Sequence, residues 1–195
     1  MQKDSILNII LVGVGLCIVC GAVISTVAVS LRDQQEQNVI FDQQSKIIDA
    51  ARLLEVYPSS QEALASIEEV VVNLNDGQPS GFPPEQYDLD SILRDSSQHT
   101  VLNGSDDIAM ISVRENLSKV YIEYRNNELK TLILPVRGYG LWGTLYGYLA
   151  LDSDLNTIVG LEFYKHKETP GLGAEVDNPN WKKLWNGKKV FDENG

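Results

Sequence analysis

The stretch "KVYIEYRNNELKTLILPVRG", residues 119–138, decides the fold class of this 195-residue chain. Apolar and polar side chains alternate along much of it, as they do on a strand with one buried face. Asn126 and Asn127 interrupt the alternation, and asparagine tolerates the left-handed backbone that a tight two-residue turn requires. The pattern therefore predicts a β-hairpin with antiparallel strands.

A second hairpin follows in the sequence. The segments "LYGYLALD" (145–152) and "TIVGLEFYKH" (157–166) have the composition of strands, and residues 153–156 join them. The segment "MISV" (110–113) also has β character. Several antiparallel strands accompanied by helices predict an α+β fold, in which a twisted antiparallel sheet carries packed helices.

A short helix is predicted after the second hairpin. Asn178 is a good N-cap, and Pro179 suits the first helical turn. The pair Asn186-Gly187 suits the end of the helix, because glycine readily adopts the left-handed backbone found there. One apolar face of this helix is expected, formed by Trp181, Leu184 and Trp185.

The N-terminal residues carry the clearest physical signal in the chain. Ile6 to Leu31 are 26 residues without a charge, and a bilayer requires about 20 apolar residues in a helix. A secretory signal has a shorter apolar region, of about 7–15 residues, before its cleavage site. We therefore predict a retained transmembrane anchor within residues 1–32, with residues 6–31 in contact with lipid.

The region between the anchor and the hairpins is predicted to be mainly helical. Residues 32–56 continue the first helix, and "SSQEALASIEEVVVNL" (59–74) forms a second one. Ser59 and Glu62 have the spacing of a capping box, which satisfies free amides at a helix start. The predicted organisation is an anchor at 1–32, a juxtamembrane helical and variable region at 33–107, and a domain at 108–195.

The charge distribution excludes one class of partner. The net charge is −11, and residues 33–107 contain 15 acidic residues against 3 basic ones. Nucleic-acid binding requires clustered lysine and arginine to neutralise phosphates, so no nucleic-acid partner is expected. The one dense basic cluster is interpreted as a solvated helix face, and it consists of Lys182, Lys183, Lys188 and Lys189.

The cysteines and histidines do not form a recognisable metal site. Cys17 and Cys20 are three residues apart within the predicted span and would share a helix face. A metal site usually needs four ligands, and the chain has no further cysteine. Packing is therefore the favoured role, with an intramembrane metal or redox site as the alternative. His99 and His166 are far apart in sequence and in different segments.

The segment "HKETPGLGAEV" (166–176) combines a Pro-Gly pair with a second glycine. Pro170 and Gly171 suit the centre of a type II turn, where glycine supplies the positive φ. The glycine spacing matches neither a phosphate-binding P-loop nor a dinucleotide fingerprint. From the residues alone, a structural turn and a ligand site both remain open, with the turn favoured.

Three stretches carry a resemblance to a known family: "STVAVSLRDQQ", "LPVRGYGLWGTLYGYLALDSDLNTIVGLEFYKHKETPGLGAEVDNPNWKKLW" and "GKKVFDEN". They resemble the FMN-binding domain family of membrane redox complexes. More narrowly, they are similar to the C subunits of sodium-translocating NADH:quinone reductases. The "GLW" motif separates these from the related G subunits of Rnf electron-transport complexes, which are kept as an alternative.

The resemblance implies an electron-transfer subunit that carries FMN. It also implies a single-pass protein of the bacterial inner membrane whose soluble domain is periplasmic and whose partners are the other reductase subunits. NADH oxidation and quinone reduction would occur elsewhere, and no catalytic residue is assigned here. The alternative is a membrane-anchored scaffold or binding module of the same fold without a cofactor. The implied flavin-contacting residues are Leu141, Trp142, Glu168, Thr169, Pro170, Gly171, Leu172 and Gly173.

One feature of the family is missing from the sequence. Its members bond FMN through the phosphate to the threonine of a Ser-Gly-Ala-Thr type motif near the C-terminus. The 195 residues contain no such motif, and the last threonine is Thr169. Because Val190 and Phe191 resemble the start of another core element, the sequence "DENG" is expected to interrupt a domain. We therefore expect no covalent flavin on this chain.

Overall fold

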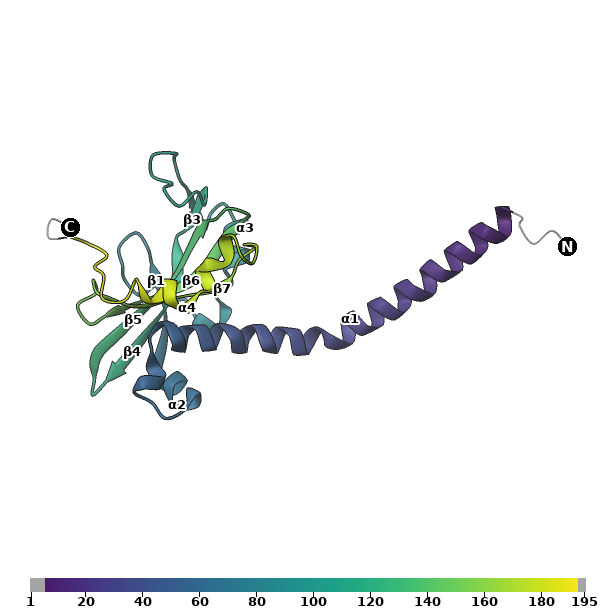
Figure 1. Ribbon diagram of the computed structural model, residues 1–195. Coiled ribbons are helices and arrows are strands. Elements are labelled where there is room, and N and C mark those ends of the chain that lie inside the picture. The colour runs from purple at the N-terminus through teal and green to yellow at the C-terminus, as the bar shows by residue number, and fades with distance from the viewer. Residues whose placement is uncertain (1–5, 193–195) are drawn as a thin grey trace. The chain divides into compact units, whose positions relative to one another are not determined.

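The computed structural model describes residues 6–192, and its contacts divide the chain into two units. One unit extends to Asp42, and the other begins at Gln43. Helix α1 (Ile6–Ala50) makes up the first and supplies the start of the second, and the strands follow it in the sequence (Figure 1). The predicted α+β class, with an N-terminal helix followed by an antiparallel sheet, is confirmed.

The described part of the first unit is helical, and all of its residues are exposed. Its apolar side chains, from Ile6 to Leu31, have no protein core against which to pack. Among the described residues, α1 is the one helix that is long and apolar enough to cross a membrane. Apolar surface of this extent indicates contact with a membrane or a partner. Cys17 and Cys20 lie on this helix as free thiols.

The second unit is built on a five-stranded sheet in the order β1-β4-β5-β6-β7, in which every neighbouring pair is antiparallel. Both predicted hairpins are confirmed, as β4 with β5 and as β6 with β7. Asn126 and Asn127 have φ values of 56° and 61°, as a type I′ turn requires. The strands are β1 (Ile67–Asn73), β4 (Leu117–Arg125), β5 (Glu128–Tyr139), β6 (Thr144–Asp152) and β7 (Ile158–Lys165).

The predicted helix at 59–74 is wrong in its second half. Helix α2 (Ser60–Ala65) is short, and the residues after it form β1, which pairs with β4. The capping box at its start is present, since the Ser59 hydroxyl accepts the Glu62 amide at 3.3 Å. The run of three valines in β1 favours a strand, because β-branched side chains pack well on a pleated surface.

The weakly patterned residues contain small elements of their own. A 3-10 turn, η2 (Pro84–Gln86), precedes helix α3 (Leu89–Arg94). Strand β2 (His99–Val101) then pairs with β3 (Val113–Glu115) in a separate two-stranded sheet. The predicted strand at 110–113 is therefore shifted, because residues 110–112 lie outside β3 and Met110 and Ser112 have positive φ.

The core of the second unit lies between one face of the sheet and the segment that begins with the end of α1. Gly160 of β7 allows the Ala50 backbone to approach closely, since a Cβ at Gly160 would overlap the Ala50 carbonyl oxygen. This unit thus begins before residue 108, because the end of α1 and α2 contribute to the core and β1 belongs to the five-stranded sheet. The core cluster is Ile47, Ile48, Ala50, Ala51, Leu53, Ala63, Tyr121, Ile133, Tyr148 and Ala150.

The residues after β7 form a 3-10 turn, η3 (Gly173–Asp177), and a short helix, α4 (Pro179–Lys183). The predicted cap is present, since the Asn178 side chain accepts the Asn180 amide at 2.9 Å. Trp181 and Trp185 contact each other, whereas Leu184 is 64% exposed and does not join them. Residues 193–195, on which the expectation of an interrupted domain partly depends, lie outside the described residues.

Candidate functional site

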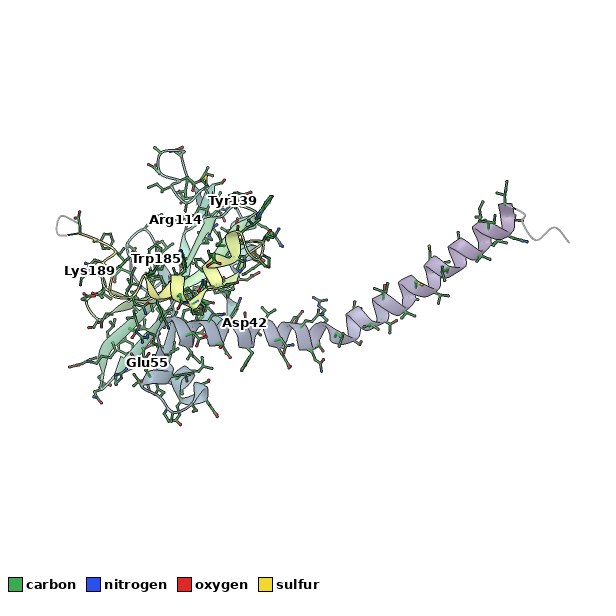
Figure 2. All side chains as sticks on the ribbon, viewed as in Figure 1. Asp42, Glu55, Arg114, Tyr139, Trp185 and Lys189 are labelled. Atoms are coloured by element: carbon green, nitrogen blue, oxygen red, sulfur yellow. The ribbon has the colours of Figure 1, made fainter. Side chains whose placement is uncertain are left out.

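Two loops meet at one end of the sheet. Residues 140–143 connect β5 to β6, and residues 166–173 leave the end of β7. Since β6 lies between β5 and β7, the register brings these loops together: Tyr139 pairs with Thr144, and Tyr146 pairs with Lys165. We call residues 140–143 and 166–173 the loop pair. Figure 2 shows Tyr139 at this end of the sheet and Lys189 away from it.

Glu168 joins the two loops from the inside. Its side chain is almost fully buried, and its Oε1 accepts the backbone N–H of Trp142 at 3.0 Å. A Cβ added at Gly140 or at Gly173 would overlap this carboxylate. The two glycines therefore provide the space that the carboxylate occupies, and Glu168 lies between the loops rather than on their outer surface.

Gly171 has a different role from Gly173. It has φ +78°, and a Cβ placed on it would contact nothing within 4 Å. The Leu172 amide donates to the Thr169 carbonyl at 3.1 Å, which closes a turn with Pro170 and Gly171 at its centre. This arrangement matches the predicted type II turn, in which the third residue needs a positive φ.

The outer surface of the loop pair is apolar and exposed. Leu141 is 68% exposed, Trp142 57% and Leu172 66%, so both loops present large apolar side chains to solvent, and exposed apolar surface that is grouped in this way can mark a binding site. This exposure shows that Trp142 is not a core residue. Thr169, Pro170 and Gly171 precede Leu172 in the second loop and are also exposed. The eight predicted site residues thus lie on two adjoining loops, with Glu168 beneath the rest.

A groove of about 460 Å³ adjoins the second loop. It is lined by charged and aromatic side chains, including Lys165, His166 and Asp177. His166 contacts both the start of the loop and the residue that ends η3. The prediction from sequence missed the roles of His166, Asp177 and Gly140, although the quoted segments contained all three. The sequence does not reveal these roles, because each depends on a contact in the folded structure with a residue of another turn or loop.

The described residues contain no group of three His, Cys, Asp or Glu side chains arranged to hold a metal ion. His99 lies in β2 and His166 follows β7, so the two histidines belong to different sheets. The loop pair has three features that a binding site could use. It offers exposed apolar side chains, a glycine with open space above it at Gly171, and a buried carboxylate that fixes its shape.

Comparison with known proteins places the loop pair in a recognised domain. The FMN-binding domain family matches residues 140–194. The C subunit of the Na(+)-translocating NADH-quinone reductase from Pseudomonas aeruginosa is 42% identical over 204 residues, covering 100% of this chain and 76% of the relative. The protein of the same name from Vibrio vulnificus is 40% identical over 194 residues, covering 99% and 76%.

Solved structures agree with the sequence comparison. The crystal structure of NqrC from Shewanella oneidensis aligns with a TM-score of 0.70 and 31% identity, covering 78% of this chain and 71% of that one. The C subunit from Parabacteroides distasonis aligns with a TM-score of 0.59 and 30% identity, covering 83% and 71%. The resemblance stated from the sequence is therefore confirmed, and the chain belongs to the family of C subunits of the Na(+)-translocating NADH-quinone reductase, an oxidoreductase complex.

Proposed function

We propose that this chain binds FMN on the loop pair and passes electrons within the reductase complex. The observation that carries the proposal is the exposed apolar surface of Leu141, Trp142 and Leu172, on two loops that one buried carboxylate joins. These residues lie within the stretch that matches the FMN-binding domain family. When bound, the flavin supplies reversible electron uptake and release, while the protein supplies orientation and environment.

The residues of the loop pair have separate roles toward a flavin. Leu141, Trp142 and Leu172 would hold the flavin ring and exclude water from it, which would shift the reduction potential of a bound flavin. The backbone at Thr169, Pro170 and Gly171 permits close approach of a flat group. Glu168 and Gly173 act from beneath by fixing the position of both loops.

The proposal concerns noncovalent binding by these residues. The phosphoester bond to a threonine, which the family resemblance implies, has no Ser-Gly-Ala-Thr motif to accept it within the 195 residues. An untethered ligand must offset about 4–15 kcal/mol of lost translational and rotational freedom. The affinity of this chain for free FMN is therefore expected to be weak but measurable.

The membrane helix sets the location of this chemistry. We propose that helix α1, which is long and apolar enough to cross a membrane, anchors the protein with its apolar residues in lipid. We place the second unit on the periplasmic side of the bacterial inner membrane, among the other subunits of the complex. Alkaline phosphatase and fluorescent-protein fusions to the C-terminus test this orientation. Phosphatase activity without fluorescence is expected, and the reverse result places the unit in the cytoplasm.

A titration of the detergent-solubilised chain with FMN tests the binding proposal. Flavin fluorescence should be quenched on binding, and Leu172→Ser or Trp142→Ala should weaken the apparent affinity by about tenfold or more, because each removes about 1.5–3 kcal/mol of apolar burial. Leu184→Ser is the matched control, because Leu184 is equally exposed but lies after α4. Its affinity should equal that of the wild type.

Two outcomes contradict the proposal. Absence of quenching up to millimolar FMN favours the alternative, a membrane-anchored binding module without a cofactor. An equal loss of affinity in the Leu184→Ser control places the flavin elsewhere. The sheet also carries an apolar groove of about 460 Å³, lined in part by Leu149, Leu161, Trp181 and Trp185. If the chain is a binding module without a cofactor, this groove is its candidate binding surface.

A further inference from the structure

His166 uses both of its ring nitrogens to hold the glycine-rich loop. Its Nδ1 accepts the backbone N–H of Glu168 at 3.2 Å, at the start of the loop. Its Nε2 lies 2.8 Å from the Asp177 carboxylate, at the end of the 3-10 turn that follows the loop. The His166 side chain is only 17% exposed, whereas that of Asp177 is 53% exposed, so the contact with Glu168 is the better shielded of the two. One side chain therefore connects the two ends of the segment 168–177.

The two contacts together specify one form of the imidazole. A backbone N–H can only donate, so Nδ1 must be free of a proton to accept from Glu168. A neutral ring then carries its proton on Nε2, where it donates to Asp177. The tautomer with the proton on Nδ1 would place two donors face to face and leave Asp177 without a donor from the ring. The geometry thus points to the neutral Nε2–H form.

The bond to Glu168 connects His166 to the whole loop pair. It fixes the backbone at Glu168, whose carboxylate lies against Gly140 and Gly173 and accepts the Trp142 amide. An exposed ion pair with Asp177 alone would contribute little. The acceptor contact at Nδ1 is different, because it sets the backbone position from which the buried carboxylate joins the loops.

A second tie holds the downstream end independently. Lys182 of α4 contacts both carboxylate oxygens of Glu162 on β7, at 2.6 and 2.5 Å, and Lys46 contacts one of them at 3.3 Å. The segment after the loop therefore stays attached to the sheet when the ring of His166 is changed. A His166 variant is expected to loosen the loop without detaching α4.

We propose that His166 is a positioning residue that holds the loop pair in its bent form before any flavin is bound. This proposal rests on the proposed function, because the role of His166 is to prearrange Leu141, Trp142 and Leu172 for the flavin. A preformed site binds more tightly, since less ordering is required on binding. The claim about loop order, however, can be tested in the cofactor-free protein.

The protonation state is tested first, in the unmodified chain. Nitrogen-15 shifts of the histidine side chains at neutral pH should show His166 with an unprotonated Nδ1 and a protonated Nε2. His99→Gln assigns the signals, because the chain contains only these two histidines. A ring that carries its proton on Nδ1, or on both nitrogens, overturns the proposal.

Amide hydrogen exchange in paired variants tests the positioning role. In His166→Asn, the side-chain oxygen lies near the place of Nδ1 and keeps the acceptor. In His166→Gln, the amide nitrogen lies near the place of Nε2 and keeps the donor to Asp177. Exchange at Glu168 and Trp142 should rise about tenfold in His166→Gln and in His166→Ala, and stay near the wild-type rate in His166→Asn.

The outcomes separate this inference from the proposed function. Equal exchange rates in the Asn and Gln variants overturn the positioning role, and this comparison stands even where His166→Ala does not fold. FMN quenching by the same variants should follow the exchange data, with His166→Asn near wild type and His166→Gln weaker by about tenfold. If the wild type binds no FMN but the exchange rates of the variants differ as expected, the proposed function fails and the positioning role of His166 remains.

Discussion

At the scale of single residues, Gly171 and Gly173 are required for different physical reasons. Gly171 has a left-handed backbone and open space around its Cα. Gly173 has an ordinary φ, but the Glu168 carboxylate occupies the place where its side chain would lie. The loop therefore combines one conformational requirement with one steric requirement.

Substitutions can separate these two requirements. Gly171→Asn should be tolerated, because asparagine visits the left-handed region, whereas Gly171→Val should not. Gly173→Val should displace Glu168 and lower the free energy of unfolding by about 1–3 kcal/mol. Chemical denaturation and tryptophan emission are the measurements, the latter in a Trp181→Phe, Trp185→Phe background that leaves Trp142 as the one tryptophan. Wild-type stability and emission in Gly173→Val would show that the carboxylate does not fill this space.

The sequence indicated the residues of the loop but not the position of Glu168 within it. The turn at Pro170 and Gly171 was predictable, because it depends on local backbone preferences. The burial of Glu168 was not predictable, because it depends on Gly140 and the Trp142 amide in another loop. Pairings of this kind follow from strand register, which no local pattern reveals.

At the scale of elements, β1 shows how pairing overrides local pattern. Its residues were predicted as helix because they follow directly on the capping box at Ser59 and Glu62. The strand exists because β4 offers an edge with which Ile67 to Asn73 pair residue by residue. The hairpins were predicted correctly because their turns and alternation are local. The end of α1 was harder to assign, since Ile47 and Ile48 become core only where the sheet covers them.

Glu123 of β4 is a buried carboxylate that connects this strand to the segment after α1. Its Oε1 accepts the Tyr57 hydroxyl at 2.8 Å and the Arg125 guanidinium at 2.9 Å, and its Oε2 lies 3.3 Å from the Thr131 hydroxyl. Removing Glu123 leaves the Tyr57 and Thr131 hydroxyls without their acceptor, while Arg125 is exposed enough to reach water. Glu123→Ala is therefore expected to lower the free energy of unfolding by about 1–3 kcal/mol.

Urea unfolding of the solubilised chain measures this effect. Glu128→Ala is the matched control, because Glu128 is paired with Lys130 on the exposed surface of the neighbouring strand. Exposed pairs contribute little, so the control should unfold at the wild-type urea concentration. Similar midpoints for both variants would contradict the assigned importance of the Glu123 network.

The turn between β6 and β7 carries a pH-dependent contact with the C-terminal segment. Hydrogen bonds from Lys189, and then from Thr157, hold the pKa of Asp154 well below its usual value. The unfolded chain therefore takes up the proton first, and the stability from Asp154 is lost as the pH falls below about 4. Asp154→Asn should lower the Tm at pH 6 and flatten its decline toward about pH 2.5. A parallel decline in both proteins would contradict this assignment.

At the scale of the whole molecule, the two units differ in how far the sequence alone defines them. The anchor was predictable because its 26 uncharged residues satisfy a purely local requirement for membrane burial. The second unit begins at Gln43, within a helix that has no break in its sequence pattern. Its boundary depends on long-range contacts of Ile47, Ile48 and Ala50 with the sheet, which composition does not reveal.

Covalent flavin attachment is a property of the whole chain and its attaching enzyme. The phosphoester attachment that the family resemblance implies would need a threonine hydroxyl within a motif that the enzyme recognises, and Thr169, the last threonine of the 195 residues, lies in the loop pair and not in such a motif. We expect the 195-residue chain, expressed together with a flavin transferase, to show no flavin fluorescence after denaturing electrophoresis. The same chain with a Ser-Gly-Ala-Thr segment added is the matched control and should fluoresce. A fluorescent band from the unmodified chain would mean that another hydroxyl accepts the flavin. Loss of that band in Thr169→Val would then identify Thr169 as the acceptor, and its persistence would exclude this residue.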